Sequence, residues 1–281
     1  MAAINYEVEY NNRARVPEHP QIFAQWTRDA ELYRLTAMEE RRAELGLAYG
    51  ESPRQLIDIF WPDAKKQAPL ALFIHGGYWK SLEPSMFSHM AQGLNGRGVA
   101  VAVAGYDLCP QVTIAEIITQ MRHASLFLWQ RIRQRLMVYG HSAGGHLAGA
   151  MVATDWHTLY PKMPADFIPA GYAISGLFDL TPLLHVDSAK DLGLDEEAAR
   201  DASPVFWPAP QGRAFDAVVG SLESSEFLRQ SKIVADAWGK AGAQTRYGEI
   251  GGTNHFTVVD PLTDPDSAMV ARLAELASKA T

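Results

Sequence analysis

The sequence has only one cysteine, Cys109, among its 281 residues. A single cysteine cannot form a disulfide within the chain, so the disulfide-stapled folds of small secreted proteins are excluded. The first residues lack both a basic segment and an apolar segment, and no apolar run approaches the length that spans a membrane. We therefore expect a cytoplasmic protein with no membrane partner.

Positive charge is also scarce. The chain has 25 Lys and Arg against 32 Asp and Glu, which gives a formal net charge of −7 at pH 7. The arginines at 41–42 and 131–135 lie in segments with a helical pattern, where charged residues usually face solvent. We therefore expect no nucleic-acid partner. No pair of histidines has a ligand spacing such as His-Glu-x-x-His, so neither a metal nor another cofactor is expected.

The remaining composition is that of a globular protein, with 47% hydrophobic and 20% charged residues. At this length, one α/β domain over residues 1–281 is the simplest organisation. Strands are predicted at 55–61, 70–74, 99–104, 136–139, 170–174, 215–219 and 245–250, and helices at 86–97, 113–133, 143–154, 226–240 and 266–279. This alternation predicts a mostly parallel sheet covered by helices on both faces, in the order of the α/β-hydrolase fold.

Two segments depart from the alternation. The N-terminal segment, at about 1–50, is predicted to be helical at 20–45, to pack on the domain and to end in a loop at 46–53. The second segment is an insertion at about 176–212, where prolines interrupt the pattern. An insertion over the top of such a sheet shapes the pockets of the active site, whereas loop statistics alone favour a plain surface excursion equally.

Ser142 is the predicted nucleophile. It lies in the sequence from Gly140 to Gly144, which fits the G-x-S-x-G pattern between a short buried strand and an apolar helix. Glycine on either side gives the backbone room for a sharp strand-to-helix turn, which pushes the serine hydroxyl out of the sheet. The alternative is a glycine-rich turn without chemistry, and the clear strand and helix on its two sides favour the nucleophile.

A second glycine-rich turn, from His75 to Trp79, follows the strand predicted at 70–74. Glycines there let backbone N–H groups face a reacting carbonyl oxygen and stabilise the oxyanion that forms on it. We expect Gly77, Tyr78 and Ala143 to donate the hydrogen bonds of this oxyanion hole. His75 is interpreted as a structural hydrogen-bonding residue.

The fold places its catalytic residues along the chain in the order serine, acid, histidine. His255 lies in a glycine-rich loop between the last strand and the last helix and is the predicted general base. Glu223 follows the strand predicted at 215–219 and is the predicted acid, which would orient the imidazole and stabilise its protonated form. Asp216, near the start of that strand, is the second choice.

These motifs resemble the kynurenine formamidase (arylformamidase) branch of the hormone-sensitive-lipase-like α/β-hydrolases. The resemblance covers most of the chain from Leu56 onward. It rests on the stretches 75–79, 106–110, 140–146, 174–180, 223–231 and 254–256. It implies a cofactor-free serine hydrolase that cleaves a small-molecule acyl substrate with Ser142, Glu223 and His255 as its triad.

Tyr78 stands where lipase-like relatives often have a third glycine. Its N–H is kept, but its side chain should narrow the acyl pocket, which then suits formyl or acetyl groups. Together with Tyr78, the aromatic residues Trp79 and Phe178 are expected to line the substrate pocket and to hold an aryl leaving group such as that of N-formylkynurenine. Ordinary core packing would explain these aromatic residues equally well.

Two other functions fit the same residues. A short-chain carboxylesterase would use the same triad, and a ligand-binding protein could keep the hydrolase scaffold without turnover. The intact serine, histidine and acid favour an enzyme over a binding protein. The sequence does not fix the oligomeric state and is compatible with a homodimer.

Overall fold

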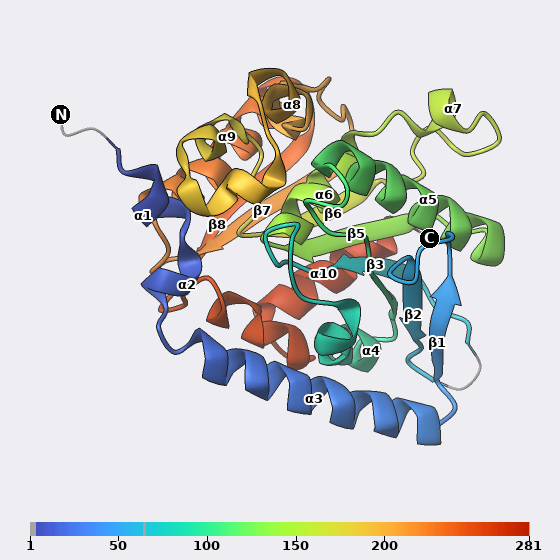
Figure 1. Ribbon diagram of the computed structural model, residues 1–281. Helices are drawn as coiled ribbons and strands as arrows, with labels where there is room; N and C mark the ends of the chain where they lie inside the picture. The colour runs from blue at the N-terminus through green and yellow to red at the C-terminus, as the bar shows by residue number, and fades with distance from the viewer. Residues whose placement is uncertain (1–3, 64–65, 281) are drawn as a thin grey trace.

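The computed structural model describes residues 4–63 and 66–280 and centres on one eight-stranded sheet (Figure 1). The strands are β1 (Ala43–Ala48), β2 (Leu56–Phe60), β3 (Leu70–Ile74), β4 (Ala100–Ala104), β5 (Leu136–His141), β6 (Ala170–Ile174), β7 (Ala214–Gly220) and β8 (Gln244–Ile250). They lie in the order β1-β2-β4-β3-β5-β6-β7-β8, with β2 antiparallel to both its neighbours and the other pairs parallel. The predicted fold class, an α/β-hydrolase fold, is confirmed.

The central strands are apolar on both faces because helices cover both faces of the sheet. Every residue of β3, β4 and β5 is buried. Leu70 pairs with Ala100 on one side and with Leu136 on the other, and this register continues without a shift to Ile74. The carboxyl ends of these parallel strands therefore reach the same edge of the sheet, where the predicted site residues follow.

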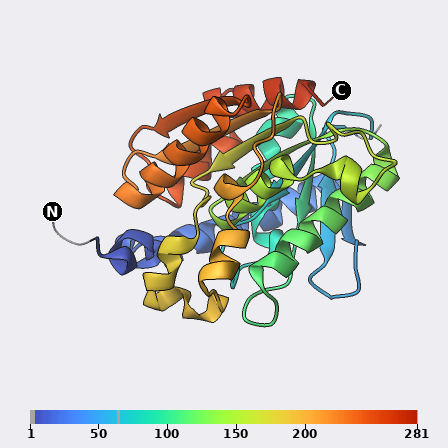
Figure 2. The same ribbon diagram turned by 90° about the horizontal axis from the view of Figure 1, so that it is seen from above.

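Helices cover the sheet in two layers (Figure 1, Figure 2). One hydrophobic cluster joins the sheet to α5 (Ile114–Ile132), α6 (Ala143–Ala153) and α9 (Ser225–Lys240), and a second joins its other face to α3 (His19–Glu39), α4 (Gln92–Gly96) and α10 (Ala268–Ser278). The shorter helices are α1 (Tyr6–Tyr10), α2 (Asn12–Arg15), α7 (Trp156–Leu159) and α8 (Glu196–Asp201). None of the described helices is long and apolar enough to cross a lipid bilayer.

The N-terminal segment differs from the prediction of a helix at 20–45 followed by a loop. Helix α3 ends at Glu39, and β1 forms an edge strand antiparallel to β2. The sequence of β1, Ala-Glu-Leu-Gly-Leu-Ala, consists largely of helix-forming residues, so pattern alone favours a helix. Pairing with β2 overrides that preference. The helix predicted at 86–97 likewise divides into the 3-10 helix η1 (Pro84–Ala91) and α4.

Two fully buried histidines should make the stability of the fold depend on pH. Burial lowers the pKa of His75 and of His146 to about 4, from an ordinary value of 6.5. The unfolded chain binds protons on these residues below about pH 6.5 and the folded chain does not, so stability is lost as the pH falls from about 6.5 to 4. Between pH 7 and pH 5, each histidine should lower the free energy of unfolding by about 2 kcal/mol.

Urea titrations of the wild type and of His146→Gln at the two pH values test this expectation. Glutamine can still accept from the Trp79 indole N–H and donate to the Ala202 carbonyl, as His146 does. The variant should lose about 2 kcal/mol less stability than the wild type on acidification. An equal loss in both proteins would show that His146 does not titrate in this range.

Candidate active site

Ser142 lies at a sharp corner between β5 and α6. Its backbone has φ 56° and ψ −120°, a conformation that L residues rarely adopt. The glycines on either side are sterically required, because a Cβ on Gly140 would lie 2.2 Å from the carbonyl oxygen of Gly144 and one on Gly144 would lie 1.9 Å from that of Ile74. The corner places Ser142 in the wall of a cavity at the edge of the sheet.

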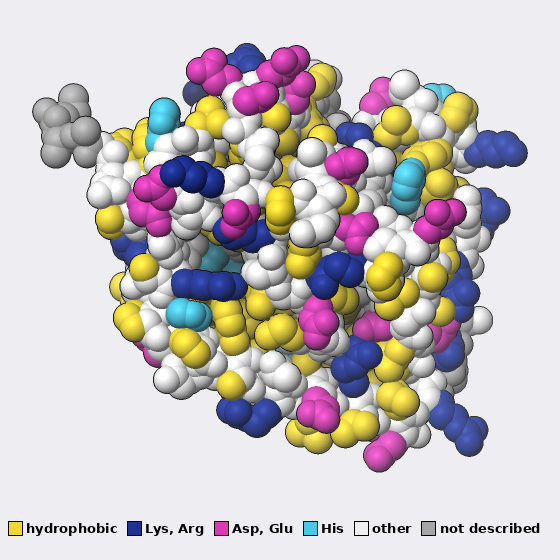
Figure 3. Space-filling view, viewed as in Figure 1, with side chains coloured by type: hydrophobic (Ala, Val, Ile, Leu, Met, Phe, Trp, Pro, Cys, Tyr) yellow, Lys and Arg dark blue, Asp and Glu magenta, His cyan; other side chains and the backbone are white. Residues whose placement is uncertain are grey.

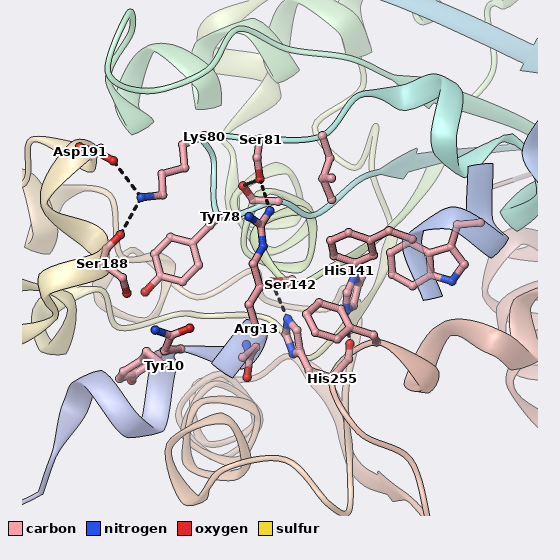
Figure 4. Close-up of a pocket in the computed structure, with 17 residues that line it drawn as sticks. Tyr10, Arg13, Tyr78, Lys80, Ser81, His141, Ser142, Ser188, Asp191 and His255 are labelled. Carbon is pink, nitrogen blue, oxygen red and sulfur yellow. Dashed lines mark hydrogen bonds and ion pairs between the residues drawn. The ribbon is translucent and has the colours of Figure 1, made fainter. Parts of the chain in front are cut away.

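A chain of hydrogen bonds joins Ser142 to the two partners predicted from the sequence. His255 Nε2 lies 2.9 Å from Ser142 Oγ (Figure 4), and His255 Nδ1 lies 2.6 Å from Glu223 Oε2. With the Nδ1 proton donated to the carboxylate, Nε2 is free to accept the proton of the serine hydroxyl. All three residues are buried. The arrangement can therefore activate the serine as a nucleophile.

Glu223 is held by two further donors besides His255. Its Oε1 accepts hydrogen bonds from the Gly220 N–H, at 2.8 Å, and from the Ser175 hydroxyl. Ser175 directly follows β6 and has a positive φ of 54°. Sequence patterns assigned Ser175 no role, although its place just after a buried parallel strand was a usable signal.

Asp216, the second choice for the acid, is paired with an arginine. It lies within β7, and its two carboxylate oxygens accept hydrogen bonds from Arg272 of α10 at 2.7 and 3.0 Å. This ion pair raises the pKa of Arg272 and joins the sheet to the helix layer. Of the two acids weighed, the structure brings Glu223 to His255.

His141, which precedes the nucleophile, anchors the loop that carries His255. Its Nε2 lies 2.8 Å from the carbonyl oxygen of His255, and the two rings are 4.8 Å apart. Burial, together with the neighbouring His255, lowers the pKa of His141 well below the ordinary range. The ring is therefore neutral, and its Nε2–H donates to the carbonyl. Only the position of His141 in the nucleophile turn could have indicated this role from the sequence.

Three consecutive residues of the turn after β3 lie in the left-handed region of backbone conformation. Gly77, Tyr78 and Trp79 have positive φ values of 117°, 58° and 54°. A Cβ on Gly77 would lie 2.1 Å from the carbonyl oxygen of Ser81, so only glycine fits there. Across the described ranges, the N–H groups of Gly77 and Tyr78 donate to no other residue. Ala143 is the first residue of α6, so its N–H group has no acceptor within the helix. These groups are available to an oxyanion.

A cavity of about 370 Å³ opens beside Ser142 (Figure 4). The N-terminal segment lines it with Tyr10, Asn11, Asn12, Arg13, Phe23 and Trp26. The segment between β6 and β7 adds Ser188 and Asp191, and both ribbon views place this segment next to α1 (Figure 1, Figure 2). Glu7 of α1 accepts the Ser188 N–H at 3.1 Å, which ties the two segments together. Nothing in the sequence pattern had placed the N-terminal helices at the site.

Trp79 and Phe178, which were predicted to line the pocket, lie in the hydrophobic core instead. Both are fully buried and neither lines the cavity. The Trp79 indole N–H donates to His146 at 3.2 Å, and the Phe178 ring packs against Phe215 with 5.7 Å between centroids. Aromatic residues near a motif fill cores by default. Of the three predicted aromatic residues, Tyr78 is the one that lines the cavity.

Residues 4–63 and 66–280 contain no group of three or more His, Cys, Asp or Glu side chains placed to hold a metal ion. The chemical groups that do converge on the cavity are the serine hydroxyl and the histidine ring, with the carboxylate behind the ring. This set is suited to acyl transfer through a covalent intermediate.

Comparisons with known proteins relate most of the chain to hydrolases. The BD-FAE family profile matches residues 57–175. A kynurenine formamidase of Drosophila melanogaster is 31% identical over 234 residues, which cover 79% of this chain and 77% of that protein. One from Danio rerio is 28% identical and covers 84% and 82%. A crystal structure from Silicibacter sp., described as a candidate thioesterase, is 34% identical with a TM-score of 0.82, covering 96% of this chain and 98% of that one.

Proposed function

We propose that this chain, which belongs to the kynurenine formamidase family of α/β-hydrolases, removes the formyl group from an aryl amide such as N-formylkynurenine, with Ser142 as its nucleophile. The relatives named kynurenine formamidase support the substrate class, and a hydrolase of the serine type follows from the family. The observation that best supports the residue roles is the chain of hydrogen bonds from Ser142 through His255 to Glu223.

The reaction runs in two steps. In the first, His255 takes the Ser142 proton while Oγ attacks the formyl carbon, and the N–H groups of Gly77, Tyr78 and Ala143 stabilise the oxyanion. The imidazolium then gives its proton to the leaving aryl amine, and a formyl ester remains on Ser142. In the second step, His255 takes a proton from a water molecule as the water attacks this ester, and the imidazolium then gives that proton to Ser142 Oγ as the Oγ–carbon bond breaks and formate is released.

Release of formate from N-formylkynurenine and from formanilide by the purified protein tests this function. We expect turnover of both substrates. An aryl acetate assayed beside them distinguishes the short-chain carboxylesterase, which would hydrolyse the ester and leave the formyl amides intact. Binding of N-formylkynurenine without release of formate would indicate a ligand-binding protein.

We also propose that the enzyme acts on a small molecule in the cytoplasm. The inability of the lone Cys109 to form an internal disulfide supports a reducing compartment. Microscopy of the tagged protein tests the location. Analytical ultracentrifugation distinguishes a monomer from the homodimer with which the sequence is compatible.

Tyr78 should restrict the acyl group to a short chain, because its side chain lines the cavity. Aryl acetates should exceed aryl butyrates in kcat/KM by roughly tenfold or more, since each excluded methylene forfeits about 1–3 kcal/mol. Tyr78→Gly should shift the preference toward longer chains. Tyr78 already has φ 58°, which glycine accepts, so the turn should keep its shape. Tyr78→Phe keeps the ring and should keep the preference, whereas a wild type that prefers octanoyl over acetyl esters would contradict the expectation.

A further inference from the structure

Arg13 crosses the cavity above the nucleophile. It belongs to α2, and Figure 4 shows its side chain extending in front of Ser142 toward the turn after β3. There Arg13 Nη2 donates a 3.0 Å hydrogen bond to Ser81 Oγ, and the Ser81 hydroxyl donates a 2.8 Å hydrogen bond to the carbonyl oxygen of Gly77. The guanidinium therefore lies beside the backbone groups that would hold the reacting carbonyl.

No acidic side chain within residues 4–63 and 66–280 pairs with Arg13. Its hydrogen bond goes to the neutral hydroxyl of Ser81, and its Cζ lies 5.8 Å from the centroid of the Phe23 ring. A guanidinium has five N–H donors, so most of them are available to a ligand. Lys80, the second cation of the cavity, is already paired with Asp191 at 3.0 Å. Figure 3 shows Lys and Arg side chains bordering a hollow beside α2, although the chain as a whole is acidic.

Tyr78 lines the same cavity, and its hydroxyl is a second unsatisfied polar group in this region. It is buried and has no hydrogen-bond partner among the described residues. Burial raises the pKa of Tyr78, so the hydroxyl remains a proton donor at neutral pH. A buried donor without an acceptor is unfavourable. The Tyr78 hydroxyl is a neutral donor, so the positive charge that favours a negatively charged ligand in this cavity comes from the exposed side chain of Arg13.

We propose that Arg13 is a specificity-determining residue that pairs with a carboxylate on the aromatic leaving group of the substrate. This inference rests on the proposed function, because a formyl group is too small to carry the carboxylate and the charge must lie on the amine side. The rings of Phe23, Trp26 and Phe256 line the same cavity and suit an aromatic group. The preferred substrates are then aryl formamides that carry a carboxylate.

A structural role for Arg13 is the competing explanation, since its hydrogen bond to Ser81 ties α2 to the turn after β3. Loss of a structural contact would lower the turnover of charged and neutral substrates alike. Loss of recognition would lower the ratio between them. The test therefore uses substrates of equal size that differ in charge.

Formamidobenzoates and formamidobenzamides, with the substituent ortho, meta or para to the formamide, supply such pairs. For at least one pair, wild-type kcat/KM should be roughly tenfold or more higher for the benzoate, as expected for hydrogen bonds to a charged group. Arg13→Gln should bring this ratio close to one, and Arg13→Lys should keep part of it, because an ammonium retains the charge but not the planar donor geometry. Arg15→Gln, on the same helix and outside the cavity, should change neither the ratio nor the turnover.

Ratios close to one for all three pairs in the wild type would overturn the inference, and so would a ratio that survives Arg13→Gln. Failure of the proposed function gives a different result, in which none of the amides releases formate. The ratio is then measured on carboxyphenyl and carbamoylphenyl acetates, whose leaving groups carry the same substituents. An Arg13-dependent preference for the carboxyphenyl esters would support the inference, and the absence of such a preference would overturn it.

Discussion

Replacing Ser142 with alanine is expected to lower kcat for an aryl formamide by roughly four to six orders of magnitude. Ser142 Oγ, 2.9 Å from His255 Nε2, is the atom that would form the covalent bond, and alanine leaves nothing in its place. The oxyanion donors and the cavity remain, so a residual rate above that of the uncatalysed reaction should persist. Initial rates of formate release at high enzyme concentration measure the effect.

Ser231→Ala is the matched control for this substitution. Ser231 is also buried, but it lies on α9 and outside the cavity. Its replacement should leave kcat unchanged, and thermal unfolding should show that both variants are folded. A Ser142→Ala protein that kept its activity to within about tenfold of the wild type would refute the role of Ser142.

Glu223→Gln should lower kcat by roughly a hundredfold or more. The physical reason lies in the donors around the side chain, because Oε1 faces the Gly220 N–H and the Ser175 hydroxyl, and Oε2 faces His255 Nδ1. The Gly220 N–H can only donate, so the glutamine oxygen must turn toward it and the amide NH₂ toward the histidine. His255 Nδ1 then accepts, Nε2 carries the proton, and the ring can no longer take the proton of Ser142.

Asp216→Asn is the comparison that separates the two candidate acids. Asp216 is bonded to Arg272, so its replacement should cost stability while kcat, measured well below the unfolding temperature, changes far less than in Glu223→Gln. The reverse order of effects would show that Glu223 is not the acid. Glu223→Asp, which keeps the charge on a shorter side chain, should fall between the wild type and Glu223→Gln.

Most of the fold could be predicted because the central strands are short, continuously apolar and separated by helices of clear periodicity. Strands buried on both faces, such as β3 and β4, have this signature. Edge strand β1 lacks it, since it is partly exposed and its residues favour a helix. Its identity as a strand depends on its pairing with β2, which is information that local sequence does not contain.

The residues of the triad could be predicted for a related reason. Ser142, Glu223 and His255 each follow a parallel strand, and parallel strands end at one edge of the sheet, so chain order alone brings the three together. The cavity wall depends instead on how α1, α2 and α3 dock, which local patterns do not specify. Local patterns therefore do not indicate Arg13, and the place of Trp79 in the turn after β3 does not show that its side chain is buried in the core.

The central claim, a covalent intermediate on Ser142, is tested most directly by labelling the protein with an aryl phosphonate and locating the label by mass spectrometry of peptides. Phosphonates react with a serine that a neighbouring histidine activates, as the 2.9 Å contact between Ser142 and His255 would allow. We expect one label per chain, on Ser142, with loss of formate release in proportion to labelling. A label on another residue, or full activity in protein labelled at Ser142, would contradict the account.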